Sequence, residues 1–221
     1  MNRTKKALIS MLVLGALAAV GAGTYATFTA STANSANTFA TGSLVLQTKV
    51  PYNTGTACLS TGAGTNTDVN SNAACTGIIF NFTNQKPGVT QSGTINVQNV
   101  GTLSGNLAAS GNACADVLVG TYNGSNSICP VVQITIQPLD GAGVPTGNCV
   151  YPAGAGLCAF PSTKTIGGIN ADSAANRALG AIAAGGSQNY QISVQLPDSG
   201  PGADNKYQGH SATVILTWSL S

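Results

Sequence analysis

The sequence contains very few ionisable side chains. Only 6% of its 221 residues are charged, whereas an ordinary globular protein has roughly 25%. It has no glutamate, a single histidine (His210) and a single tryptophan (Trp218). An HExxH zinc motif is therefore excluded, and a Ser-His-Asp triad would depend on His210. Because no basic stripe is present, we expect no nucleic-acid partner.

The formal net charge of +2 comes from the N-terminus. Arg3, Lys5 and Lys6 lie within the first six residues, and the five basic and six aspartate residues that follow balance to −1. Since 43% of the residues are apolar, the chain is not a charged disordered polymer. Its solubility must come from serine, threonine, asparagine, glutamine and glycine.

The first 26 residues have the pattern of a signal peptide. Basic residues precede a run at 7–22 that is apolar except for one serine, and small residues stand at positions −3 and −1 of a cut after Ala26. We expect a signal peptidase to cut between Ala26 and Thr27 and to release a secreted chain of 195 residues. The alternative is an uncleaved membrane anchor, although 16 apolar residues are fewer than the roughly 20 that a span needs. A type IV pilin helix is a weaker alternative, because the cleavage motif of that class is absent.

Six cysteines follow the signal: Cys58, Cys75, Cys114, Cys129, Cys149 and Cys158. An even number in an exported chain indicates disulfides, although six cysteines allow 15 pairings. Each lies in a segment rich in Gly, Asn or Ser, and closing a short loop costs little entropy. We therefore favour the neighbouring pairs 58–75, 114–129 and 149–158. No CxxC pair occurs, so we expect no zinc site, no catalytic cysteine and no cofactor.

Alternating apolar residues predict several short strands, at 43–50, 77–82, 93–100, 117–122, 131–139, 188–196 and 211–219. Residues 84–88 predict a turn, and Pro138 is expected to end its strand or to place it at a sheet edge. The alanine-rich segment 172–184 is the best helix candidate. Many strands, Gly and Pro turns and little helix predict an all-β fold, an antiparallel β-sandwich with long loops stapled by disulfides.

The predicted organisation is a signal peptide (1–26), an N-terminal arm (27–42) and one β-sandwich domain (43–221). The arm carries no charge, and its bulky side chains are Phe28 and Phe39. Such a segment stays disordered or extended until it meets a partner. It could add a strand to a sheet edge of another molecule, with the phenylalanines in pockets. The alternative is a flexible leader to a monomeric domain.

Four other side chains have simple interpretations. His210 lacks a nearby second ligand and is expected to be a loop histidine. Asp198 and Asp204 lie in a Gly/Pro loop, where they are turn formers more often than calcium ligands. Trp218 is in phase with apolar residues of the last predicted strand and is expected in the core.

Several motifs occur in an order typical of one family. They are GAGTYATF at 21–28, NTFATGSLVL at 37–46, NQKPG at 84–88, NVGTL at 99–103 and DNKYQGHS at 204–211. This order resembles the TasA/camelysin family of exported bacterial proteins, whose signal peptides are cut by a SipW-type peptidase. The resemblance covers both ends and the first half of the chain and is weak across 105–185. Residues 29–30 and Val45 depart from it, since family members usually have Asp there, and six cysteines are not typical.

The resemblance implies a jelly-roll-like β-sandwich and a structural role at the cell surface or in a biofilm matrix. It implies an arm that pairs with a neighbouring subunit, and hence a homo-oligomer or filament. Asn205, Tyr207, Gln208 and Gly209 match its last motif, and we expect them to form a structural corner that holds the loop 197–210. A secreted or surface-attached adhesin is the alternative. A camelysin-like metalloendopeptidase is a third, disfavoured because no glutamate base or second histidine is present.

Overall fold

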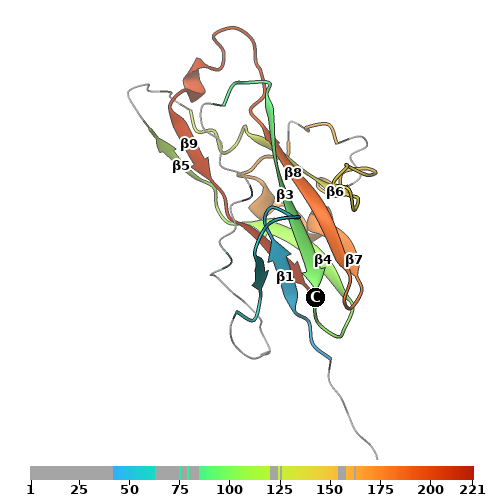
Figure 1. Ribbon diagram of the computed structural model, residues 1–221. Coiled ribbons are helices and arrows are strands. Elements are labelled where there is room, and N and C mark those ends of the chain that lie inside the picture. The colour runs from blue at the N-terminus through green and yellow to red at the C-terminus, as the bar shows by residue number, and fades with distance from the viewer. Residues whose placement is uncertain are drawn as a thin grey trace, which may run out of the picture. The chain divides into compact units, whose positions relative to one another are not determined.

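The computed structural model describes residues 42–62, 75, 79, 85–119, 124, 126–153, 158–161 and 163–221. The predicted all-β class is confirmed, since most of the regular secondary structure is antiparallel strand (Figure 1). The strands are β1 (Leu46–Lys49), β2 (Ala57–Leu59), β3 (Thr90–Asn99), β4 (Gly105–Gly111), β5 (Ala115–Leu118), β6 (Gln133–Leu139), β7 (Ala178–Ile182), β8 (Ser187–Gln195), β9 (His210–Thr213) and β10 (Leu216–Leu220). The helical turns are η1 (Ile169–Ala171), α2 (Ala174–Arg177) and η2 (Asn205–Tyr207).

The strands form three sheets. The largest has the order β2-β1-β3-β8-β6, the second has the order β10-β4-β7, and β5 pairs with β9. Since β5 follows β4 and β9 precedes β10, the β5–β9 pair extends the β4–β10 pair. The Asn112 N–H donates to the Ile215 carbonyl at 3.0 Å and the Ile215 N–H donates to Asn112 Oδ1 at 2.7 Å, which joins the two pairs into one long ribbon.

The core lies between the five-stranded and three-stranded sheets. Alternate residues of β3 and β8 are buried, and they form one apolar cluster with Leu107 of β4 and Ile182 of β7. The rings of Tyr190 (β8) and Trp218 (β10) stack with their centroids 5.7 Å apart. Because these rings belong to different sheets, the contact joins the sheets face to face in a β-sandwich-like arrangement. Trp218 thus packs against the core, as predicted.

Three disulfides join Cys58 to Cys75, Cys114 to Cys129 and Cys149 to Cys158. They are the neighbouring pairs that the sequence favours, and every cysteine is bonded. The bonded cysteines are 17, 15 and 9 residues apart in the sequence. Removing chain entropy from the unfolded state in this way contributes about 3 kcal/mol for a loop of 15 residues.

The prediction of a helix at 172–184 is wrong beyond the first turn. The α2 helix spans Ala174–Arg177, with the Ser173 hydroxyl accepting from the Asn176 N–H, and β7 follows immediately. Gly180 has a φ of 106°, which no α-helix allows, while Leu179 and Ile182 are buried against the core. Pairing with β4 therefore overrides the helix propensity of the alanines.

Other strand predictions differ in detail. The closing strand 211–219 is divided into β9 and β10, and β5 ends at Leu118. The predicted strand 77–82 lies outside the described residues, apart from Ile79. Pro138 lies in an edge strand, β6, as predicted. Among the described residues, no helix is long and apolar enough to cross a membrane.

Candidate functional site

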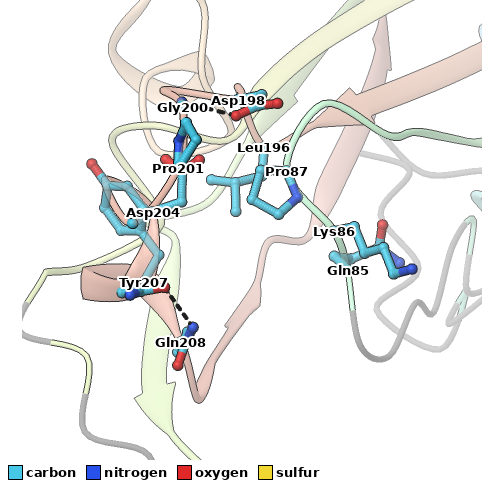
Figure 2. A pocket seen from close by; sticks show the side chains of 12 residues that line it. Gln85, Lys86, Pro87, Leu196, Asp198, Gly200, Pro201, Asp204, Tyr207 and Gln208 are labelled. Atoms are coloured by element: carbon cyan, nitrogen blue, oxygen red, sulfur yellow. Dashed lines mark hydrogen bonds between the residues drawn. The ribbon is translucent and has the colours of Figure 1, made fainter.

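A groove lies where the turn at 85–88 meets the loop that follows β8 (Figure 2). Its volume is about 460 Å³. Figure 2 shows Lys86 on the side of the turn and Tyr207 on the opposite side, with Pro87 and Leu196 between them. The motifs at 84–88 and 204–211 therefore line one groove, although Lys86 and Asp204 are 118 residues apart in the sequence.

Backbone hydrogen bonds fix the turn against the end of β8. The Gly88 N–H donates to the Leu196 carbonyl at 2.8 Å, and the Gln195 side chain donates to the Gly88 carbonyl at 2.8 Å. Gly88 has a φ of 77°, and a Cβ there would lie 3.3 Å from the Cβ of Asp198. The turn therefore needs glycine both for its backbone conformation and for its close approach to the loop.

The two acidic side chains of the groove bind the backbone of their own loop. Asp198 accepts from the Gly200 N–H at 2.9 Å, and Asp204 accepts from the Ser199 N–H at 3.0 Å. They are turn formers, as predicted. Within the described parts of the chain, no three His, Cys, Asp or Glu side chains are grouped as a metal site would require. The groove thus offers a lysine, two aspartates and a tyrosine, a set that suits a neutral polar ligand.

The block Asn205–Gly209 makes structural contacts. Gln208 donates to the Asn205 side chain at 2.8 Å, and its carbonyl accepts from the Gly124 N–H at 3.1 Å. The Gly209 carbonyl accepts from the Val119 N–H at 2.6 Å. These bonds connect the block to the chain after β5, which is what a structural corner requires.

His210 is not an isolated loop histidine; that expectation is wrong. It begins β9, its Nδ1 lies 2.9 Å from Asp116 Oδ1, and its Nε2 lies 3.2 Å from the Gly124 carbonyl. Its hydrogen bond to Asp116 raises the pKa of His210 above its usual value, although burial opposes the shift. Burial alone would raise the pKa of Asp116, but hydrogen bonds from Ser127, His210 and Ile128 outweigh it and lower that pKa. Both ring nitrogens face acceptors, and only the imidazolium can donate to both.

A second polar cluster surrounds Asp172, and no pattern in the sequence indicates it. Lys164 Nζ lies 2.7 Å from Asp172 Oδ2, and the Tyr151 hydroxyl donates to the same oxygen at 3.0 Å. Asn176 and the Ser173 N–H donate to Oδ1 at 2.7 and 2.8 Å. Burial opposes ionisation, but these hydrogen bonds, led by that of Asn176, hold the pKa of Asp172 far below its usual range. With both oxygens occupied, the carboxylate is a structural anchor and is not poised for proton transfer.

One face of the β5–β9 pair exposes apolar side chains. Val117, Val119 and Ile215 are 57%, 53% and 61% exposed, and Leu118 on the opposite face is 51% exposed. The register pairs Val117 with Ser211 and Ala115 with Thr213, and strand alternation places all of these side chains on one face. No charged side chain occupies these positions. Exposed apolar patches on a sheet are typical of interaction surfaces.

The remaining predicted site residues, Ala26, Thr27, Phe28 and Phe39, lie outside the described residues. No model of a protein family matches the chain, and a search of curated proteins finds no match. The assignment to the TasA/camelysin family therefore stays a prediction that rests on the sequence motifs.

Proposed function

We propose that the protein is an exported structural subunit of a cell surface or biofilm matrix. It assembles when the N-terminal arm (27–42) of one subunit adds as a strand to its neighbour. The observation that carries this proposal is the exposed, uncharged face of the β5–β9 pair, with Val117, Val119 and Ile215. A face of this kind lowers the cost of packing against a second uncharged chain.

Two further properties support the proposal. Three disulfides fit an extracellular or otherwise oxidising environment. The balance of −1 beyond residue 6 leaves little electrostatic repulsion between identical subunits. Main-chain hydrogen bonds along an added strand would supply the affinity, and Phe28 and Phe39 of the arm would supply specificity.

The test uses the chain that begins at Thr27. We expect the purified protein to form filaments, seen by electron microscopy and by light scattering that grows with protein concentration. Deleting residues 27–41 should abolish the filaments and leave circular dichroism and the thermal midpoint unchanged. A protein that remains monomeric over all concentrations, pH values and salt levels contradicts the proposal.

The second candidate function is that of a secreted binding module, and the groove between Lys86 and Tyr207 favours it. Its mixed charges and aromatic ring suit a polar, uncharged ligand such as a polysaccharide. This function predicts a monomer whose binding to a glycan array is lost in Tyr207→Ala and is unaffected by deletion of 27–41. Tyr52→Ala, a tyrosine outside the groove, is the matched control.

A further inference from the structure

The fold gathers the three charged residues of the segment 141–197 in one cluster. Lys164 Nζ bonds to Asp172, and the Tyr151 hydroxyl donates to the same carboxylate. Burial and Asp172 raise the pKa of Tyr151, and the nearby positive charge of Arg177 opposes that rise. Tyr151, Lys164, Asp172 and Arg177 are called the Arg177 cluster below; two positive charges and one negative charge leave it with a net charge of +1.

The carboxylate of the cluster is already saturated with donors. Lys164 and Tyr151 donate to Oδ2 of Asp172, and Asn176 and the Ser173 N–H donate to its Oδ1. A carboxylate offers about four lone-pair sites, and these donors occupy them. The second cation of the cluster therefore finds no acceptor on this carboxylate.

Arg177, in α2, is that second cation. Its side chain is half-buried, and its Nε is buried without a hydrogen-bond acceptor. Within the described part of the chain, its guanidinium makes no hydrogen bond and no salt bridge. Native proteins pair almost all buried donors, because an unpaired donor is not compensated for its lost hydration. The guanidinium therefore lacks a partner that the described chain does not supply.

A carboxylate is the partner that fits this group. A guanidinium presents its donors in a planar fork, which matches the two oxygens of a carboxylate. Lys164 adds a second positive charge to the cluster, and its side chain is 24% exposed. The net charge of +1 favours a carboxylate over a phosphate, which carries up to two negative charges.

The surface around α2 indicates what kind of molecule carries the carboxylate. Ser173, Ala174 and Ala175 are exposed, small and uncharged. Among the described residues from 145 to 214, no large apolar side chain is exposed. The buried centre of a protein interface is apolar and rich in aromatic side chains, so this surface suits a protein partner poorly. A hydroxyl-rich chain that bears carboxylates, an acidic polysaccharide, needs no such apolar contact.

We infer that Arg177 binds the carboxylate groups of an acidic polysaccharide. Such binding is separate from the proposed assembly, because the Arg177 cluster lies within one chain. A single contact of this kind is weak in water, since partly exposed ion pairs contribute little. Repeated carboxylates along a polymer and repeated copies of the protein would raise the overall affinity.

Nuclear magnetic resonance of the guanidinium tests the binding directly. Arg177 is the single arginine of the chain that begins at Thr27, so its Nε–H group gives one separate signal. Oligogalacturonate, a neutral malto-oligosaccharide and a glutamate oligopeptide are titrated separately into the ¹⁵N-labelled chain at constant ionic strength and mildly acidic pH. We expect oligogalacturonate to shift the signal with saturation and the neutral sugar to leave it unchanged. No shift with oligogalacturonate, or an equal or larger shift with the peptide or the neutral sugar, overturns the inference.

Substitutions test the binding independently, by affinity electrophoresis in gels that contain polygalacturonate. Arg177→Gln should weaken the binding about fivefold or more, and Arg177→Lys, which keeps the charge without the fork, should lie between it and the natural protein. Lys206→Gln removes one exposed charge elsewhere and should leave the binding unchanged. Tyr207→Ala should also leave it unchanged, because the groove at Tyr207 does not include Arg177.

The outcomes separate binding from structure and from assembly. Thermal unfolding should show the natural midpoint in Arg177→Gln, because the guanidinium makes no bond within the described chain. Equal losses of binding in Arg177→Gln and Lys206→Gln would reveal attraction by net charge alone and overturn the inference, as would a lowered midpoint with unchanged binding. A chain that shows the saturable shift of the Arg177 signal but forms no filaments contradicts the proposed function and supports this binding site.

Discussion

The imidazole of His210 in β9 lies 2.9 Å from the carboxylate of Asp116 in β5. The two residues are diagonal neighbours, because His210 pairs with Leu118 and Asp116 pairs with Ala212. The contact joins strands that are 94 residues apart in the sequence, and the second ring nitrogen of His210 reaches Gly124. One side chain thus connects β9, β5 and the segment that follows β5.

This contact makes stability depend on pH. The pKa of His210 is raised, so its stabilisation is complete below the unfolded value of 6.5 and is lost as the pH rises through the folded value. The pKa of Asp116 is lowered, so its stabilisation is present above 3.8 and is lost as the pH falls through the folded value. We expect the contact to stabilise the fold most between pH 3.8 and 6.5.

Thermal unfolding at a series of pH values measures this effect. Between pH 6.5 and 9 the midpoint of the natural protein should fall by about 2–4 °C for each kcal/mol of interaction lost. In His210→Gln this fall should be absent. Equal pH dependence in both proteins would show that another group is responsible.

Asp172→Asn should lower the free energy of unfolding by about 2 kcal/mol, because it leaves Lys164 beside a partly buried, uncharged amide and disturbs the Tyr151 hydrogen bond. Urea denaturation at pH 7 measures the loss. Asp198→Asn is the control, since Asp198 is exposed and bonds to the backbone of its own turn, and we expect it to change stability by less than about 1 kcal/mol. Similar losses in the two variants would refute the structural importance of the Asp172 cluster.

Gly88→Ala should cost about 1–2 kcal/mol, because alanine is strained at a φ of 77° and its Cβ would press on Asp198. Gly141→Ala provides the comparison, since no atom lies within 4 Å of a Cβ at that position. We expect it to change the free energy of unfolding by less than about 0.5 kcal/mol. Chemical denaturation of the two variants side by side decides whether the turn requires glycine.

Replacing Cys114 and Cys129 together by alanine should lower the free energy of unfolding by about 3 kcal/mol, the value for a closed loop of about 15 residues. The bond joins the start of β5 to the segment before β6, so its loss should also speed amide exchange in β5. Calorimetry and hydrogen exchange measure the two effects. An unchanged thermal midpoint would mean that packing alone holds this segment.

The sequence predicts the larger sheet better than the smaller one. In β8, Tyr190, Ile192 and Val194 alternate with polar residues, and this pattern identifies the strand. The strand β4 has no such pattern, because its core positions include Gly105 and Gly111, where a Cβ would lie 2.7 Å from Leu220 and 2.6 Å from Ile169. Close packing requires small residues at these two positions, so β4 lacks the alternating large apolar residues by which a strand is recognised.

The candidate site shows the same difference: local features could be predicted from the sequence, and contacts between distant strands could not. The turn at Gly88 can be recognised from the sequence alone, because proline fixes φ and glycine tolerates a positive φ. The His210–Asp116 contact cannot, since its partners come together only through the pairing of β5 with β9. The pairs of cysteines could be predicted because each bond closes a short loop.

The stacking of Tyr190 on Trp218 provides the protein with a built-in optical probe. Trp218 is the single tryptophan of the chain, so all indole fluorescence comes from one position between the two sheets. Trp218 also lies in β10, which is an edge strand of its sheet. Emission from this ring therefore reports separation of the sheets during unfolding and, in the folded protein, any change of solvent at that edge. Both processes can be followed in the natural chain without a label.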